Sequence, residues 1–300
     1  MPLEYRTYKN IKFYGNPEKA DVLKYSRLVG LELEQSIRNS APMKVPLSYG
    51  VTSDGGGYEI QTPPASADKL ERIIKKVTDE ISKGGGYATT GAGYHIHLDG
   101  SGFVDNHVNA IRLTNTYFVI EPIIYSMLSQ YRRSSSWCRN LTTTINEHEF
   151  RRLLRSQHKN DIYYLHKTYY KQQVDQKYID RNIKNNKNAG QRLGFNLNAL
   201  FAYGHIEMRY HAGTVNRDKI QNWAWLHLHL MDWVMNNYSK NKIMKIREET
   251  DISKKTEMFF KHMNVPETLR RYIKYRQGRF SQPLINEFDD DGDYTNNLLT

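Results

Sequence analysis

Apolar and polar residues alternate along four short stretches of the chain, at residues 27–35, 58–62, 93–99 and 203–211. A period of two residues is typical of β-strands that are buried on one face and polar on the other. Pro63 follows the second stretch and ends it, because proline cannot donate a backbone hydrogen bond to a neighbouring strand. We therefore expect a sheet with one apolar and one polar face.

Between and after these strands, apolar residues recur at the spacing of a helix. Residues 67–83 carry Leu, Ile and Val every three to four positions, and the three glycines at 84–86 are expected to stop that helix. A longer helix is expected from about residue 105 to residue 132, with a kink at Pro122. Another helix is expected after Asn216, whose side chain can cap it.

The polar face of three strands carries ionisable residues where lysine, serine and threonine are more usual. On each strand these residues stand two positions apart and therefore point to the same side. The pairs are Glu32 with Glu34, His95 with His97, and Glu207 with Arg209. His205 and His211 are expected to share the face of the last pair. An ordinary solvent-exposed strand explains one such pair well, but it explains all three together poorly.

Carboxylates that converge on one site repel one another and raise one another's pKa unless a cation neutralises them. Asp54 and Glu59, on either side of a glycine-rich turn, add two more oxygen ligands to the set. An oxygen-rich set favours Mg²⁺, with Mn²⁺ as the alternative, over zinc. Arg209 supplies a guanidinium beside Glu207, and a metal ion together with an arginine is suited to a polyphosphate. Neither common glycine-rich phosphate-loop motif occurs in the chain.

Composition narrows the class of protein without identifying it. The 300 residues include 43 Lys or Arg and 32 Asp or Glu, and the resulting net charge of +11 favours negatively charged partners. Residues 151–190 hold 10 Lys or Arg, 3 Asp or Glu and five tyrosines, so we expect a basic, Tyr-rich insertion at about residues 145–190. A single cysteine, Cys138, no apolar run of about 18 residues and no secretory signal predict a cytoplasmic protein without a membrane association.

Five motifs resemble those of the amidoligase family, a branch of the glutamine-synthetase-like carboxylate–amine ligases. They follow the family's order over about residues 27–235: GLELE at 30–34, DGGGYEIQTP at 54–63, GYHIHLD at 93–99, the Glu-Pro, Arg-Arg and Trp-Cys-Arg groups within 121–139, and RLGFNLNALFAYGHIEMRYHAGT at 192–214. Each motif alone is weak, but their common order is hard to explain by chance. The sequence departs from the family pattern at His205, which stands where the family often has threonine, so no role is given to it.

The resemblance implies two metal sites and a phosphate-binding group. The ion nearer the phosphates of ATP would be held by Glu32, His95 and Glu207. The ion nearer the carboxylate substrate would be held by Glu34 and Glu59, with Asp54 as the least secure ligand. Phosphate oxygens would be contacted by His97 and Arg209, and Arg192 would bind substrate or phosphate.

The resemblance also implies an α+β fold, with a glutamine-synthetase-like curved antiparallel sheet and helices packed on its outer face. Residues 1–240 would form the catalytic domain, and residues 241–300 a helical extension with an acidic tail. The implied activity is an ATP- and Mg²⁺-dependent ligation. It would join a carboxylate to an amine through an acyl phosphate, release ADP and form an amide or isopeptide bond. Both substrates remain unidentified, and either could belong to an acidic peptide or a nucleic acid; the oligomeric state is also open.

Two other classes of protein remain as alternatives. The basic Tyr-rich segment could bind nucleic acid, with phosphates on its lysines and arginines and bases on its tyrosines. The nucleic-acid-binding hypothesis leaves the carboxylates on the strands unexplained. A jelly-roll enzyme could instead bind a metal through His95, His97 and Glu207 and act without ATP.

Overall fold

The computed structural model describes residues 27–37, 50–54, 57–83, 86–88, 91–104, 106–155 and 192–281. Most of the expected basic insertion and the acidic tail lie outside these residues. In chain order the elements are β1 (Val29–Ile37), β2 (Gly50–Asp54), β3 (Gly57–Gln61), α1 (Ala67–Lys83), β4 (Gly86–Tyr87), β5 (Gly93–Asp99), α2 (His107–Ser126), α3 (Gln130–Arg133), η2 (Leu141–Thr143), α4 (Glu147–Leu153), β6 (Phe195–Asn196), α7 (Asn198–Tyr203), β7 (His205–Ala212), α8 (Arg217–Asn237), α9 (Lys240–Glu248), α10 (Ile252–His262) and α11 (Glu267–Arg279).

The strands form an antiparallel sheet in the order β2-β3-β1-β5-β7-β6, and β4 pairs with the end of β1. Alternation along β1 buries Val29, Leu31 and Leu33 on the apolar face. The apolar residues of β5 and β7 are buried with them in one continuous core. The expectation of a sheet with one apolar face is therefore confirmed.

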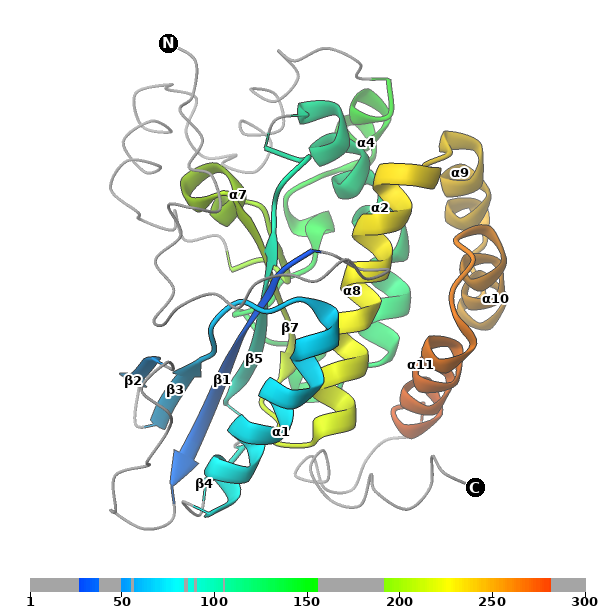
Figure 1. Cartoon of the computed structure of the whole chain (residues 1–300). Coiled ribbons are helices and arrows are strands. Elements are labelled where there is room, and N and C mark those ends of the chain that lie inside the picture. The colour runs from blue at the N-terminus through cyan, green and yellow to red at the C-terminus, as the bar shows by residue number, and fades with distance from the viewer. Residues whose placement is uncertain are drawn as a thin grey trace.

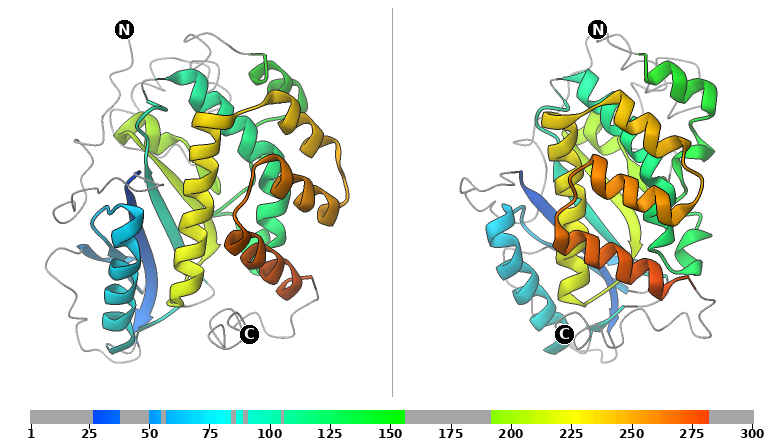
Figure 2. Two further views of the ribbon diagram at one scale, coloured as in Figure 1. Left: turned by 45° about the vertical axis from the view of Figure 1, so that its right-hand side comes forward. Right: turned by 90° about the vertical axis from the view of Figure 1, so that its right-hand side faces the viewer.

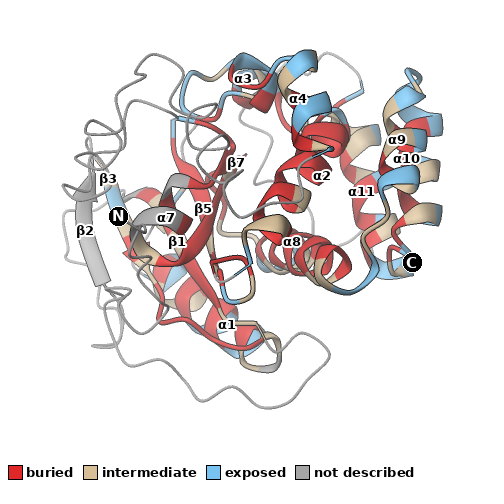
Figure 3. Ribbon diagram, turned by 90° about the horizontal axis from the view of Figure 1, so that it is seen from above, coloured by how far each residue is buried: buried red, intermediate tan, exposed pale blue. Residues whose placement is uncertain are grey.

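Helices α1, α2 and α8 lie along one side of this sheet (Figure 1). Buried residues concentrate where these helices and the sheet meet (Figure 3). Helices α9, α10 and α11 form a further layer outside α2 and α8, which they contact directly (Figure 2). The α+β class is thus confirmed, whereas the glutamine-synthetase-like form of the sheet and the division at residue 240 stay predictions.

The helix expected at about residues 105–132 is divided in two. Helix α2 ends at Ser126, and α3 begins after Ser129, whose side chain accepts a hydrogen bond from the backbone N–H of Arg132. Ser129 is therefore a helix N-cap, which the apolar pattern alone did not reveal. Asn216 caps α8 as expected, since its side chain accepts from the N–H of Lys219.

In the part of the chain that the structure describes, no helix combines the length and apolar character needed to cross a membrane. The described sheet is single and covered by helices, unlike the two packed sheets of a jelly roll. That arrangement contradicts the jelly-roll alternative.

A buried carboxyl group joins the helices to the sheet. Glu121 of α2 accepts hydrogen bonds from the hydroxyl of Tyr210 on β7 at 2.8 Å and from the backbone N–H of Leu141 at 2.7 Å. Burial raises the pKa of Glu121 from 4.5 to about 8, although both hydrogen bonds act in the opposite direction. The folded protein therefore favours the protonated carboxyl at neutral pH.

This pKa predicts a loss of stability as pH rises. Between about pH 4.5 and 8 the folded state binds more protons at Glu121 than the unfolded state does, so the free energy of unfolding falls with increasing pH. The slope from one such group is at most about 1.4 kcal/mol per pH unit. We expect Glu121→Gln to remain folded and to flatten that slope in urea-unfolding series.

The matched control is Glu257→Gln, which alters an exposed carboxylate paired with Lys274 and should leave the slope unchanged. An unchanged slope in Glu121→Gln would show that Glu121 is ionised in the folded protein.

Candidate active site

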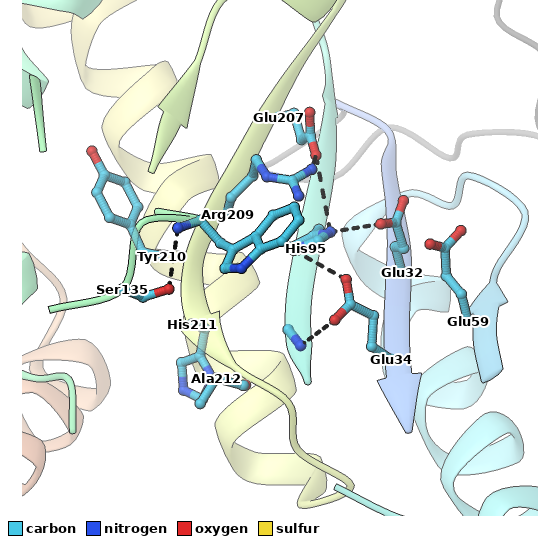
Figure 4. A network of polar contacts seen from close by, with 12 residues as sticks. Glu32, Glu34, Glu59, His95, Ser135, Glu207, Arg209, Tyr210, His211 and Ala212 are labelled. Carbon is cyan, nitrogen blue, oxygen red and sulfur yellow. Dashed lines mark hydrogen bonds and ion pairs between the residues drawn. The ribbon is translucent and has the colours of Figure 1, made fainter. Parts of the chain in front are cut away.

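The register of the sheet gathers ionisable residues from four strands on the face opposite the helices (Figure 4). The register pairs that do this are Glu34 with Glu59, Glu32 with His95, and His97 with Glu207. The predicted site residues from distant parts of the chain therefore meet.

One group of potential metal ligands consists of Glu32, His95 and Glu207, whose ligand atoms all lie within 4.8 Å of one another. Nδ1 of His95 is 2.6 Å from a carboxylate oxygen of Glu32 and 3.9 Å from one of Glu207. His95 and Glu207 are buried, and Glu32 is only slightly exposed. These are the three residues expected to hold the ion nearer the phosphates.

A second group consists of Glu32, Glu34 and Glu59, again with ligand atoms within 4.8 Å of one another. Glu34 and Glu59 were expected here, and the structure adds Glu32, so one carboxylate belongs to both groups. Asp54 ends β2 beside the start of β3, but its side chain lies outside the described residues. Its role as a ligand stays a prediction.

The pKa values of two carboxylates in these groups shift in opposite directions. Burial acts to raise the pKa of Glu32, but the positive charges and hydrogen bonds of His95 and His97 hold it well below its ordinary value. Burial and then the negative charges of Glu32 and Glu34 raise the pKa of Glu59 to about 7. At neutral pH, Glu59 therefore retains a proton more readily than an ordinary carboxyl group does.

Two cationic groups lie at the other end of the polar face. Nε2 of His97 is 3.0 Å from Glu32, whose contact outweighs burial and raises the pKa of His97. Arg209 donates to Glu207, and its charge overcomes the effect of burial and lowers the pKa of Glu207. Glu34 and Glu59 thus lie on β1 and β3, whereas the cationic groups of His97 and Arg209 lie on β5 and β7.

The donor set fits a hard divalent cation. Carboxylate oxygens with a single imidazole are ligands of Mg²⁺ and Mn²⁺, and a cation between Glu32 and Glu59 would remove the repulsion that raises the pKa of Glu59. The orientation of His95 also fits, because Nδ1 faces Glu32 while Nε2 lies 3.6 Å from Glu34. A carboxylate on the far nitrogen is the usual support of a metal-binding histidine.

Gly93 leaves the space that His95 and Glu34 occupy. Its backbone N–H donates to Glu34 at 2.6 Å. A Cβ atom at this position would stand 2.6 Å from Nε2 of His95 and 3.3 Å from a carboxylate oxygen of Glu34. The first residue of the GYHIHLD motif is therefore glycine for a steric reason.

Three polar residues without an assigned role also contact the site. Asn196 of β6 donates to Glu207 at 2.6 Å, and Gln61 of β3 donates to Glu59. His205 lies 3.0 Å from Nδ1 of His97, and burial together with the charge of His97 lowers the pKa of His205 to about 3. The sequence signal for Gln61 was its place two residues after Glu59. Asn196 had no such signal because β6 is only two residues long.

Arg192 is exposed, and its guanidinium lies over the ring of Trp137. The backbone N–H of Arg139 donates to its carbonyl at 2.7 Å, which brings the last two motifs together at the edge of the sheet. Contact of Arg192 with substrate or phosphate stays a prediction.

His211 was wrongly expected on the polar face. Its ring packs edge-on against Tyr94 and Trp223 on the helix side. The cause is a β-bulge: while β5 advances two positions from Tyr94 to Ile96, β7 covers three positions between His211 and Met208. The extra residue reverses the side-chain alternation beyond it.

The sequence matches the family described as "putative amidoligase enzyme" over residues 27–231. The chain therefore belongs to this amidoligase family, as its motifs indicated, and its family name is that of a ligase. No curated protein matches the chain at a significant level. The matched segment includes every described strand and ends within α8.

Gly93→Ala tests whether the site binds a divalent cation. The added methyl group must displace His95 and also crowds Arg132 and Glu34. Loss of the support around a metal ligand typically costs about ten- to a hundredfold in metal affinity. We expect a loss in that range for Mn²⁺, measured by electron paramagnetic resonance. Gly91→Ala is the matched control, because a Cβ atom there meets nothing within 4 Å. Equal Mn²⁺ affinity in both variants would count against the site.

The pKa of Glu59 predicts how metal affinity varies with pH. Its carboxylate must lose a proton to bind an ion, so affinity should rise through a pKa of about 7. We expect Mn²⁺ binding to be roughly tenfold tighter at pH 8 than at pH 6, with proton release detectable by calorimetry in buffers of different ionisation enthalpy. Glu59→Gln should bind more weakly and lose most of this dependence. A pH-independent wild-type affinity would exclude Glu59 as a ligand.

Proposed function

We propose that this protein is an ATP- and Mg²⁺-dependent carboxylate–amine ligase that forms an amide or isopeptide bond through an acyl phosphate. The observation that carries the proposal is one sheet face with two three-residue ligand groups that share Glu32, next to Arg209. The family match supports the ligase class. ATP, the metal ions and the glutamine-synthetase-like form of the fold belong to the proposal.

The distribution of charge supports one orientation of the substrates. His97 of β5 and Arg209 of β7 are the cationic groups that we expect to neutralise phosphate oxygens. Glu34 and Glu59 lie at the β1–β3 end, where an anionic substrate carboxylate needs a bound cation to approach. Mg²⁺ would neutralise the phosphates and the substrate carboxylate and hold them in line.

The reaction consists of two displacements. An oxygen of the substrate carboxylate attacks the γ-phosphorus of ATP, the bond from that phosphorus to the β,γ-bridging oxygen breaks, and ADP leaves. The amine nitrogen then attacks the carbonyl carbon of the acyl phosphate, inorganic phosphate leaves and the nitrogen loses a proton. The protein mainly has to position the groups and neutralise charge, which is the role we give to Arg209 and His97.

The test is ADP release from ATP with Mg²⁺ across a panel of carboxylates and amines. We expect substrate-stimulated ADP formation in the wild type and at least about a hundredfold loss in Glu34→Ala and in Glu207→Ala, because each change removes a charged group from the site. Glu248→Ala removes an exposed carboxylate of α9 and should keep full activity. Circular dichroism and thermal unfolding would show that the variants are folded.

A fully active Glu207→Ala enzyme would exclude the proposed metal group. If the wild type neither turned over nor bound ATP, and instead bound DNA or RNA in a salt-sensitive way, the nucleic-acid-binding alternative would replace the ligase.

A further inference from the structure

The bulge in β7 lies directly at the site. It places Arg209 and Tyr210 together opposite His95 of β5. Arg209 remains on the polar face and donates to Glu207, while Tyr210 turns to the helix side and donates to Glu121. The backbone conformation at this bulge therefore sets the direction in which the guanidinium of Arg209 points.

A buried arginine holds the bulge from the side of α3. Arg132 is 3% exposed, and it donates from Nη2 to the carbonyl of Arg209 at 2.6 Å and from Nε to the carbonyl of Tyr210 at 3.0 Å. A bulge interrupts the ladder of backbone hydrogen bonds, so its carbonyl groups need other donors. The planar guanidinium offers two donors in a fixed relation and can serve two consecutive carbonyls, which the single ammonium group of lysine cannot match.

Arg132 is itself held in place by the chain around it. Its own N–H is bound by the Ser129 cap, and its carbonyl accepts from the thiol of Cys138 at 3.2 Å. Nη2 also lies 3.2 Å from the position of a Cβ atom on Gly93, next to His95 and Glu34. The guanidinium thus stands directly behind the site without being open to a ligand.

We infer that Arg132 is a positioning residue, which acts on the reaction by fixing the β7 bulge so that Arg209 points at the phosphate group. This inference rests on the proposed function for the identity of the ligand. The contact of Arg132 with the bulge does not depend on that function. Arg132 belongs to the sequence segment at 121–139 that resembles the family but had no role assigned to it.

The neighbouring Arg133 provides a matched control for a purely structural role. It lies on the same short helix and donates to three backbone carbonyls, those of Leu128, Ser126 and Phe280. None of these carbonyls belongs to a strand of the polar face. Removal of either arginine should lower the thermal stability, but only removal of Arg132 should alter the site.

The first measurement is a double-mutant cycle on Mg²⁺–ATP binding, by isothermal titration of the full chain. We expect Arg209→Met and Arg132→Met each to weaken binding by about ten- to a hundredfold, the range for a hydrogen bond to a charged group. The double variant should be no weaker than Arg209→Met alone, because Arg132 acts through Arg209. Arg132→Lys should recover little of the loss, and Arg133→Met should bind as the wild type does. Additive losses in the double variant, or wild-type binding in Arg132→Met, would overturn the inference.

The second measurement is amide hydrogen exchange of peptides that cover residues 205–212. Exchange should be faster in Arg132→Met, or in Arg132→Lys if the methionine variant does not fold, and unchanged in Arg133→Met. Unchanged exchange in the Arg132 variants would refute the contact between Arg132 and the bulge, whatever the protein binds. A wild type that does not bind Mg²⁺–ATP would instead defeat the proposed function, while the exchange data would still decide whether Arg132 fixes the bulge.

Discussion

The mutual repulsion of Glu32, Glu34 and Glu59 is the constraint around which the polar face is arranged. Burial disfavours the charged form of a carboxylate. His95 and His97 offset this effect at Glu32, because both contact its carboxylate. Burial and the negative charges of Glu32 and Glu34 raise the pKa of Glu59 to about 7. A divalent cation bound between Glu32 and Glu59, as we propose, would offset this repulsion.

Strand β7 connects this polar face to the interior of the protein. Glu207 and Arg209 point to the site, whereas Tyr210 stacks with Tyr117 and His227 between the sheet and the helices. The change from one environment to the other occurs at the bulge. The same few residues therefore determine both how the helices pack on the sheet and how the cationic end of the site is oriented.

The sequence allowed the residues that meet on the polar face to be predicted better than the parts that support them. The grouping of Glu32, His95 and Glu207 could be predicted because strict alternation shows which side chains of a strand share a face. The family resemblance then related strands that lie far apart in the chain. The alternation of apolar and polar residues does not indicate the bulge, so His211 was assigned to the wrong face. The short strand with Asn196 and the contact of Arg132 with two carbonyls depend on backbone geometry, which has no compositional signal.

The isolated bridge between Arg139 and Leu193 brings together two chain segments that more than fifty positions separate. The backbone N–H of Arg139 donates to the carbonyl of Arg192 at 2.7 Å, and the carbonyl of Arg139 accepts from the N–H of Gly194 at 2.8 Å. The bridge therefore joins the segment that carries Trp137 and Arg139 to the start of β6, whose Asn196 contacts Glu207.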